Sequence, residues 1–345
     1  MVNKRRRIIT FVLIDIFGRE FEFGNTDPLV IVNTDGNPID VNRDPIFQSQ
    51  LMPDLIGSRL IKYIPQSEET NIIIPDGIIE ILPSAFENCT TISSVRIPSS
   101  VRRIKAFAFA GCTSLANIVF LSNATKVDDT AFVGCESLKN EDGLVIINGT
   151  LFDCFNNSSS IEIPDNVHTI GACAFNDCNN LRKISIPYSV KEICCGAFRG
   201  CVGLADKDGF IIVRDILHDY INKPVHVAIP NGVRAVKSNA LANCCKECLS
   251  LTFPGSIDEV TRMTTLGGRW SKLESIAISG GTRTIKMSFN CCPNLQSVII
   301  PQSVTAIENS FLDCPNLIIH APANSFGIQY AKENAIQFIE EQPNE

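Results

Sequence analysis

The chain has 345 residues, of which 45% are hydrophobic and 19% charged, and its formal net charge is −7. This composition excludes a wholly disordered chain, because it is sufficient to build a buried core. Acidic and basic residues are interspersed, which argues against a nucleic-acid-binding protein, since such proteins carry a concentrated basic patch. No stretch approaches the roughly 20 consecutive apolar residues of a membrane-spanning helix, so no membrane insertion is expected.

Residues 1–70 carry no repeat and are predicted to form a small β-rich cap. A basic run and an apolar run open the chain, but Asp15 interrupts the apolar run and no small-residue cleavage site follows. We therefore expect no secretory signal peptide. Two hairpins are expected, around Phe17-Gly18 and around Asp35-Gly36. Such a cap would cover the first coil of a repeat domain, whose apolar core would otherwise be exposed.

Residues 71–338 are dominated by a repeat, with 23 residues between Ile72 and Val95 and again between Ile161 and Ile184. The unit reads L-x-x-I-x-I-P-x-x-V-x-x-I-x-x-x-A-F-x-x-C. Alternation within I-x-I predicts a short strand with one buried face. The three- and four-residue apolar spacing after it predicts a tight helical or 3₁₀ return on the far side. Because one such coil cannot bury its apolar face alone, the coils are expected to stack into a repeat solenoid.

This repeat resembles the BspA-like leucine-rich repeat, whose hallmark is the pattern I-x-I-P-x-x-V-x-x-I-x-x-x-A-F-x-x-C. The resemblance implies a right-handed leucine-rich-repeat coil with a parallel β-sheet on one face and short helical or 3₁₀ returns on the other. The match is clearest in the five units that contain AFENC, AFAGC, AFVGC, AFNDC and AFRGC. In the units that end at Cys292 and Cys314, the Ile-to-Phe spacing is one residue short, so distorted coils are expected there.

Two insertions of similar sequence interrupt the repeats, near residues 141–160 and 206–225. In the first, Asn148-Gly149 lies between two alternating apolar runs. This is a strong signal for a two-residue hairpin turn, in which both turn residues have a positive φ. Arg214-Asp215 holds the same place in the second insertion. We therefore predict two inserted β-hairpins that project from the same side of the solenoid.

The end of the repeat region, near residues 325–338, is predicted to form a capping helix. Its residues Tyr330, Ala331 and Ala335 have helical spacing. A cap at this end would cover the last coil, as the β-rich cap covers the first. Residues 339–345 are expected to be a loose tail.

Cysteines recur at one position of the repeat. Free cysteine is a small hydrophobe suited to a narrow buried space, and stacked neighbours with parallel side chains have poor geometry for a disulfide. We therefore interpret these residues as packing thiols. The odd total of 15 cysteines argues against a disulfide framework, and free thiols favour a reducing compartment such as the cytoplasm, or an anaerobic setting. This cysteine ladder consists of Cys89, Cys112, Cys135, Cys178, Cys201, Cys244, Cys292 and Cys314.

The C-x-x-C spacing of Cys245 and Cys248 is typical of half a zinc site or of a redox pair. This spacing motivates one alternative interpretation, a zinc- or redox-active protein. No second pair of ligands is obvious from the repeat register, so a metal site is not the expected outcome. The four histidines lie in different coils, and no phosphate-binding loop or catalytic triad spacing occurs. We therefore expect neither an enzyme nor a cofactor.

Repeat solenoids bind other proteins through their long sheet surfaces. Here the exposed strand positions are small and mixed, which suits a protein partner better than a small molecule. The resemblance to BspA-like proteins implies a microbial surface adhesin that binds host extracellular-matrix proteins. The free thiols and the lack of a signal peptide instead favour an intracellular scaffold or effector, so both locations are kept as hypotheses. The candidate binding residues on the exposed sheet face are Arg96, Asn117, Glu162, Lys183, Ser185 and Thr252.

Overall fold

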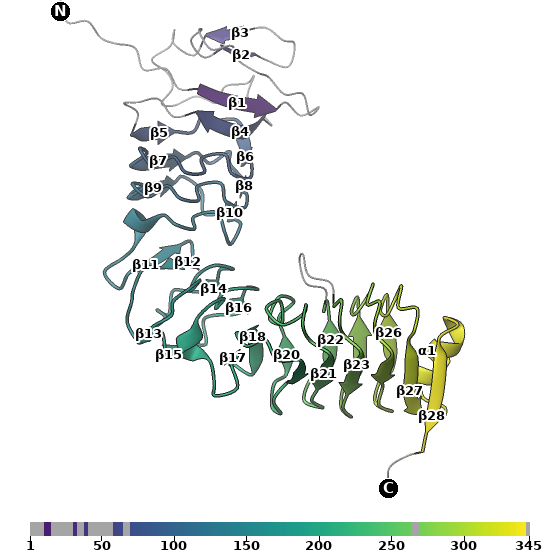
Figure 1. The fold of residues 1–345 in the computed structure, drawn as a ribbon. Coiled ribbons are helices and arrows are strands. Elements are labelled where there is room, and N and C mark those ends of the chain that lie inside the picture. Colours follow the sequence, from purple (N-terminus) through teal and green to yellow (C-terminus); the bar gives the residue numbers. More distant parts are fainter. Residues whose placement is uncertain are drawn as a thin grey trace, which may run out of the picture. The chain divides into compact units, whose positions relative to one another are not determined.

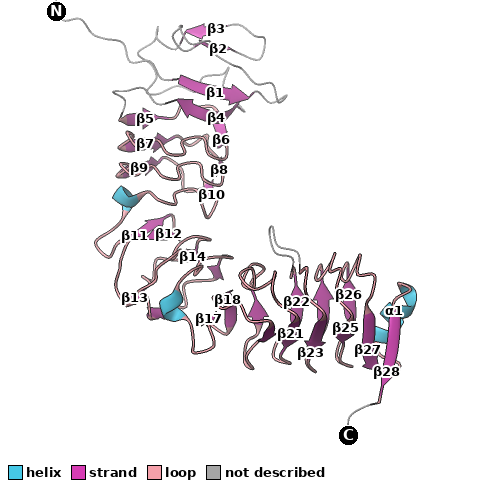
Figure 2. Cartoon of the chain, in the orientation of Figure 1, coloured by secondary structure: helices cyan, strands magenta, loops and turns pink. Residues whose placement is uncertain are grey.

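The computed structural model of the protein describes residues 10–14, 30–32, 38–40, 58–64, 70–263 and 270–342. Short strands joined by turns account for most of this structure (Figure 1; Figure 2). The chain divides into two compact units, and every sheet lies within one of them. The first unit comprises residues 1–156, 163–174 and 186–194, and the second comprises residues 157–162, 175–185 and 195–345.

Each coil contributes two short strands, one from I-x-I and one that ends at the last apolar residue before Ala-Phe. In the first unit, the first strands pair in parallel in one sheet and the second strands pair in parallel in another (Figure 1). Equivalent residues of successive repeats are partners, so Ile72 pairs with Val95, and Val95 with Ile118. The first strands are β5 (Asn71–Ile73), β7 (Ser94–Ile97) and β9 (Asn117–Phe120), and the second strands are β6 (Ile78–Ile81), β8 (Arg103–Ile104) and β10 (Lys126–Val127).

The returns between strands differ from the helical or 3₁₀ segments that the sequence predicts. Their backbone N–H groups alternate between two kinds of acceptor. Phe86 N donates to the Ala108 carbonyl of the next coil (2.6 Å) and Phe109 N to the Ala131 carbonyl (2.8 Å), whereas Cys89 N donates to the Phe86 carbonyl of its own coil in a single turn (3.1 Å). A return held in this way is a second ladder of extended chain and turns. Among the described residues, 3₁₀ helices occur only next to the two insertions, as η2 (Glu136–Leu138) and η3 (Val202–Leu204).

The stack of strands begins before residue 71. β1 (Thr10–Ile14) pairs antiparallel with β4 (Ser58–Ile64), and β4 pairs in parallel with β6. β2 (Val30–Val32) and β3 (Pro38–Asp40) form an antiparallel pair on either side of Asp35-Gly36. The hairpin expected around Phe17-Gly18 lies outside the described residues.

A stack of aromatic rings runs through the core of the first unit. The rings of Tyr63, Phe86, Phe109 and Phe132 are stacked, with successive centroids 5.0, 4.6 and 5.1 Å apart. All four side chains are fully buried. Their spacing follows the separation of roughly 4.8 Å between paired strands, so the backbone ladder places one ring directly on the next.

Each insertion forms a hairpin, and both residues of each turn have a positive φ: Asn148 and Gly149 in the first, Arg214 and Asp215 in the second. The second strand of each hairpin also pairs in parallel with the next coil. The prediction that the hairpins project from the solenoid is therefore wrong, because this strand replaces the second strand of a coil. The strands are β11 (Leu144–Ile147) and β12 (Thr150–Cys154) with β14 (Thr169–Ile170) and β16 (Glu192–Ile193), and β17 (Phe210–Val213) and β18 (Ile216–Tyr220) with β20 (Ala235–Val236).

In each hairpin, the side chain of an aspartate accepts a hydrogen bond from the backbone of the Ala-Phe turn that precedes the insertion. Asp153 Oδ2 accepts a hydrogen bond from Gly134 N (2.7 Å), and Asp219 Oδ2 accepts one from Gly200 N (3.0 Å). Burial raises the pKa of both carboxyl groups, and the bonds from backbone N–H groups partly offset this rise. The two insertions are thus anchored in the same way.

In each hairpin, the residue immediately before this aspartate contributes an aromatic ring to the core. Phe152 meets Phe132 edge-on, with centroids 5.4 Å apart. His218 holds the equivalent place in the second hairpin and meets Phe198 edge-on at 5.1 Å. The second insertion therefore buries an imidazole where the first buries a phenyl ring.

Besides the sheet that contains the second hairpin, the second unit has three parallel sheets, of six, three and two strands. The six-stranded sheet orders its strands as β19, β21, β23, β25, β27 and β28, and β22, β24 and β26 form a three-stranded sheet (Figure 1). The remaining strands are β13 (Ser160–Glu162), β15 (Lys183–Ser185), β19 (His226–Ala228), β21 (Ser250–Phe253), β22 (Glu259–Thr261), β23 (Ser275–Ile278), β24 (Thr284–Lys286), β25 (Ser297–Ile299), β26 (Ala306–Glu308) and β27 (Ile318–Pro322).

The C-terminal segment contains a helix and a further strand. α1 (Phe326–Glu333) begins after Ser325, whose side chain accepts a hydrogen bond from Ile328 N, and it buries Tyr330 and Ala331. The strand β28 (Gln337–Glu341) follows and pairs in parallel with β27. The expectation of a loose tail from residue 339 is therefore wrong for residues 339–341, because β27 offers them a free edge with which to pair.

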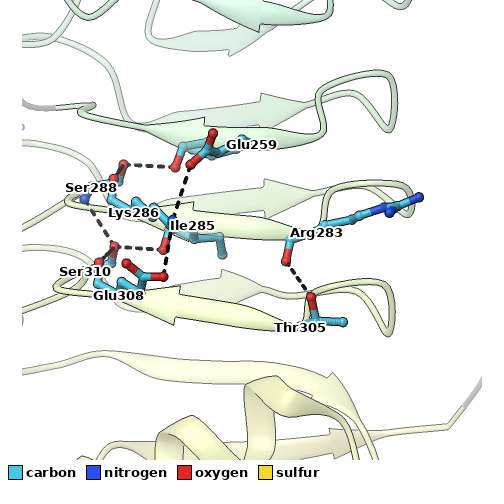
Figure 3. A network of polar contacts seen from close by, with 9 residues as sticks. Glu259, Arg283, Ile285, Lys286, Ser288, Thr305, Glu308 and Ser310 are labelled. Atoms are coloured by element: carbon cyan, nitrogen blue, oxygen red, sulfur yellow. Dashed lines mark hydrogen bonds and ion pairs between the residues drawn. The ribbon is translucent and has the colours of Figure 1, made fainter.

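The two short coils of the second unit carry serine where the repeat has alanine before phenylalanine. Ser288 and Ser310 are fully buried, and their hydroxyl groups bond to backbone groups of two coils (Figure 3). Ser310 Oγ accepts from Ser288 N (3.2 Å) and donates to the Glu308 carbonyl (2.9 Å). Ser288 Oγ accepts from Met263 N (3.3 Å) and donates to the Lys286 carbonyl (2.8 Å). Each hydroxyl thus supplies polar contacts to the buried backbone of a shortened coil.

Replacing Ser310 with alanine is expected to lower the free energy of unfolding by about 1–3 kcal/mol, because the buried Ser288 N–H loses its hydrogen-bond acceptor. Urea unfolding measures the change. Thr305 is the matched control, since it is exposed and its hydroxyl makes only a 3.4 Å contact to the Arg283 carbonyl (Figure 3). Thr305→Ala should change the free energy by less than about 0.5 kcal/mol. Equal effects of the two substitutions would contradict a structural role for the buried serine.

Candidate functional site

The six binding residues predicted from the sequence lie on three different sheets. Arg96 and Asn117 belong to the β5–β7–β9 sheet of the first unit. In the second unit, Glu162, Lys183 and Ser185 lie on the β13–β15 pair, and Thr252 lies on β21 of the six-stranded sheet. Thr252 is half-buried and the other five are exposed. The structure therefore does not gather these residues into one sheet surface.

The six-stranded sheet presents the most extensive regular surface among the described residues. Its strands pair in register, with Val227, Leu251 and Ile276 among the inward residues and fully or almost fully buried. The alternate residues point outward and form two rows across the strands. We call these rows the outer sheet face: His226, Ser250, Ser275, Ser297, Ile318 and Gln337 in one row, and Ala228, Thr252, Ala277, Ile299, His320 and Ile339 in the other.

The outer sheet face changes character along the stack. At the β19 end it is small and polar, and His226 Nδ1 lies 2.8 Å from Ser250 Oγ. Toward β28 it exposes two large aliphatic side chains, Ile299 at 42% and Ile339 at 49%. His320 lies between them, with its Nδ1 3.2 Å from the carboxylate of Glu341. Sequence reasoning missed Ile339 because its strand was expected to be a loose tail, although Phe338 and Ile339 are residue types enriched in strands.

The neighbouring β22–β24–β26 sheet has its charges paired within the sheet. Lys286 Nζ lies 3.9 Å from a carboxylate oxygen of Glu259 and 3.3 Å from one of Glu308 (Figure 3). Arg283 Nε lies 3.4 Å from Asp258 on the same sheet edge. Such exposed ion pairs contribute little to stability, but they match the charges of this sheet with one another. The outer sheet face instead exposes aliphatic side chains, which a protein interface would bury.

In the first unit, the cysteine ladder is a row of hydrogen-bond donors as well as a row of packing groups. The thiol of Cys112 donates to the carbonyl of Phe86 (3.1 Å), and the thiol of Cys135 donates to that of Phe109 (3.1 Å). Each acceptor belongs to the preceding coil. The sequence explains why a small apolar residue is buried there, whereas the need for a donor is visible only in the structure.

The second unit repeats this contact, and most ladder thiols are inaccessible. Cys201 donates to the Phe175 carbonyl at 2.8 Å. Six of the eight ladder residues are buried, and Cys178 and Cys314 are half-buried. In the first unit, the pKa of Cys112 is raised by the neighbouring thiol of Cys135 and by burial. A thiol held in its protonated form is a poor nucleophile, which fits a structural role for the buried members.

Replacing Cys135 with alanine is expected to lower the free energy of unfolding by about 1–2 kcal/mol, because it removes the donor to Phe109 and leaves a small cavity. Chemical denaturation followed by circular dichroism measures this loss. Cys291 is exposed and provides the control, since Cys291→Ala should change stability by less than about 0.5 kcal/mol. A neutral effect of Cys135→Ala would show that the thiol is dispensable.

The structure places Cys244, Cys245 and Cys248 in one helical turn. Cys248 N donates to the Cys244 carbonyl (3.0 Å), so Cys244 and Cys248 lie one above the other. The thiol pair is accordingly Cys244 and Cys248, and their mutual hydrogen bond raises the pKa of Cys244 and lowers that of Cys248. All three thiols are buried. In the described part of the chain, no three His, Cys, Asp or Glu side chains form a cluster that could hold a metal ion.

An open groove of about 760 Å³ lies at the C-terminal end of the second unit. The last coil forms one wall, and the segment between α1 and β28 forms another. Tyr330 of α1 also lines it, and its hydroxyl donates to the Ser310 carbonyl (2.6 Å). The groove brings one ladder residue, Cys314, to an accessible wall. None of the described helices has the length and apolar composition to cross a membrane.

A sequence profile for the BspA-type leucine-rich repeat region matches six copies, at residues 65–142, 145–264 and 217–318. The chain belongs to this family. The match confirms the resemblance seen in the repeat motif, and the parallel coils of the structure confirm the solenoid fold class. BspA-type leucine-rich repeats form binding scaffolds for proteins, as stacked repeats generally do.

Several solved structures are similar to this BspA-type chain. A leucine-rich cell surface protein of Faecalibacterium prausnitzii is 21% identical, over 85% of this chain and 96% of that chain, with a TM-score of 0.32. A leucine-rich repeat protein of Bacteroides ovatus is 20% identical, over 83% and 95%, with a TM-score of 0.31. The pneumococcal vaccine antigen PcpA is 16% identical, over 83% and 94%, with a TM-score of 0.33. No curated protein is significantly similar in sequence to this chain.

Proposed function

We propose that this BspA-type protein is a non-catalytic scaffold that binds another protein through the outer sheet face of its second unit. The observation that carries the proposal is the register of the six parallel strands, which holds two rows of outward side chains on a rigid support. A surface of this kind does not have to order itself before it binds, so little conformational entropy is lost on association.

The composition of the outer sheet face fits a protein partner. Ile299 and Ile339 form an apolar centre on either side of His320. The serines of the other row provide hydrogen-bonding groups beside it. Protein interfaces combine an apolar core with a polar rim in this manner. The binding energy is expected to reside mainly in the aliphatic side chains at the β28 end.

More specifically, we propose that the protein is a microbial surface adhesin that binds host extracellular-matrix proteins. Membership of the BspA-type family supports this assignment. The second candidate is an intracellular scaffold or effector. It is favoured by one observation: the fifteen cysteines, all of which lie in the described residues, form no disulfide, and thiols persist in reducing compartments.

Protease treatment of intact source cells distinguishes these two locations. A surface adhesin is cut while cytosolic markers survive. An intracellular scaffold is protected in intact cells and is released on lysis with its thiols reduced, an outcome that would refute the adhesin proposal.

Binding to immobilised extracellular-matrix proteins tests the outer sheet face itself. Ile299→Glu places a charge in the apolar centre and is expected to weaken binding at least tenfold, because a buried unpaired carboxylate opposes association. Thr305→Glu is the matched control, an exposed position beside the other sheet of the same unit, and it should bind like the wild type. Both variants should retain the wild-type circular dichroism spectrum. Unchanged binding by Ile299→Glu would exclude this face as the site.

A further inference from the structure

The last residue of the cysteine ladder differs from the others in its surroundings. Cys314 lines the 760 Å³ groove, whereas Cys201 and Cys292 in the same unit are fully buried. Cys178 is half-buried like Cys314, but it is not among the residues that line this groove. The coil that carries Cys314 ends the repeat, so the groove occupies the space that another coil would fill. A small molecule in the groove can therefore reach this thiol.

A second thiol prepares Cys314 for reaction. Cys292 lies one coil earlier, and the hydrogen bond between the two thiols lowers the pKa of Cys314 and raises that of Cys292. Cys314 Sγ also lies 3.3 Å from the Phe289 carbonyl, as expected for a ladder thiol, and 3.7 Å from the Leu312 carbonyl. The neighbouring carboxylate of Asp313 opposes ionisation of Cys314. Tyr330 of α1 is the further titratable group that faces it.

We propose that Cys314 is a thiol–disulfide exchange site, that the groove admits a small peptidic disulfide, and that Cys292 is the positioning residue that stabilises the reacting thiolate. This site goes beyond the proposed scaffold function and does not depend on it.

The reaction is a balanced exchange that needs no other oxidant. Cys314 loses its proton to solvent, and its sulfur attacks one sulfur of the disulfide R–S–S–R. A bond forms between Cys314 and that sulfur, the original S–S bond breaks, and RS⁻ leaves with the electron pair. The Cys314 sulfur is oxidised to a mixed disulfide, and the departing sulfur is reduced to a thiolate.

The groove has the size and the polar groups that such a reagent needs. Its volume lies within the range of roughly 300–1,000 Å³ that is typical of small-molecule sites. The amide side chains of Asn316, Asn334 and Gln337 line it together with the ring of Tyr330. Their carbonyl oxygens accept hydrogen bonds, so they match the amide N–H and ammonium groups of a peptidic disulfide.

Cys291 provides an internal control for simple exposure. It is the exposed cysteine of the described chain, its Sγ lies 3.7 Å from a carboxylate oxygen of Asp313, and it is not among the residues that line the groove. Exposure alone predicts that Cys291 reacts first. The groove and the Cys292 contact predict that Cys314 reacts first.

The test treats the reduced full-length protein with oxidised glutathione and maps the first adduct by peptide mass spectrometry. The adduct is expected on Cys314. Cys314→Ser should slow the first modification at least tenfold, and Cys291→Ser should leave the rate unchanged. First modification at Cys291 or at another thiol, or an unchanged rate in Cys314→Ser, would overturn the proposal.

A pH profile tests the role of Cys292 separately from folding. The rate of alkylation of Cys314 by iodoacetamide is measured against pH in the wild type and in Cys292→Ala, with circular dichroism to confirm that both are folded. The midpoint of the profile should move to higher pH in Cys292→Ala, because the thiolate loses its donor. Cys201→Ala removes a ladder thiol elsewhere in the unit and should leave the midpoint unchanged. Equal midpoints in the wild type and Cys292→Ala would refute the positioning role.

Discussion

His218→Phe is expected to stabilise the protein by about 1–3 kcal/mol at neutral pH. His218 is almost fully buried and neither ring nitrogen makes a hydrogen bond, so both polar atoms are desolvated without compensation. Phenylalanine removes this penalty, and the site accepts its ring because the first hairpin already carries Phe152 in the equivalent place.

The same substitution should abolish a loss of stability in acid. The pKa of His218 is lowered to about 4, mainly by burial and further by the charge of Lys237. The Val213 backbone lies near enough to oppose this shift, but its geometry is not that of a regular hydrogen bond. The unfolded chain binds the proton near pH 6.5 and the folded chain only near pH 4. Stability therefore falls as the pH decreases from 6.5 to 4, by about 3 kcal/mol in total.

Urea unfolding of the wild type and His218→Phe between pH 4 and 7.5, followed by fluorescence, measures both effects. Trp270 is the single tryptophan and is buried in the second unit, where His218 also lies. Other titrating groups, including Asp219, are common to the two proteins, so the difference between them isolates His218. Phe152→His should introduce a comparable acid sensitivity in the first hairpin. A difference that does not change with pH would contradict the buried neutral imidazole.

Phe109→Ala is expected to lower the free energy of unfolding by about 3–5 kcal/mol. The ring of Phe109 is fully buried between Phe86 at 4.6 Å and Phe132 at 5.1 Å. The backbone ladder holds the coils at a fixed separation, so the stack cannot close around the missing ring. The loss should therefore combine the transfer free energy of the side chain with the full cost of the cavity.

Circular dichroism during urea unfolding measures this change, and Phe107 is a control of the same residue type two positions away. Phe107 is 42% exposed, and its φ is positive. Alanine adopts a positive φ no more easily than phenylalanine does, so the substitution does not change the backbone strain at this position. Phe107→Ala should change the free energy by less than about 0.5 kcal/mol. If both substitutions had the same effect, the ring stack could not be an important source of stability.

The strands were predictable because burial alternates along each of them. In β7, Val95 and Ile97 are buried and Arg96 is exposed, as the I-x-I alternation predicts. The returns were not predictable from spacing, because apolar groups three and four residues apart fit both a helix and a turn. What distinguishes them is the acceptor of the Phe109 N–H, which is the carbonyl of Ala131 in the next coil.

The candidate site was predictable only in part. Thr252 and its repeat equivalents could be placed on an exposed strand face, since they follow the repeat frame. The sequence could not show that Arg96 and Thr252 belong to different sheets, because the insertions divide the ladder of first strands and local spacing says nothing about such breaks. Cys314 could not be singled out as an accessible thiol, because it keeps the F-x-x-C spacing of the other ladder cysteines and only the structure shows the groove that it lines.

The sequence by itself determined the period, the buried face of each strand, the hairpin turns and the position of the cysteine ladder. These features depend on residues close together in the chain, through side-chain alternation and turn geometry. The tertiary structure alone decided which partner each group meets: the carbonyl that accepts from each thiol, the coil that each hairpin strand extends, and the edge that orders β28. It also left His218 without a hydrogen bond and Cys314 open to a groove. These outcomes depend on contacts between successive coils about 23 residues apart, and no local pattern specifies them.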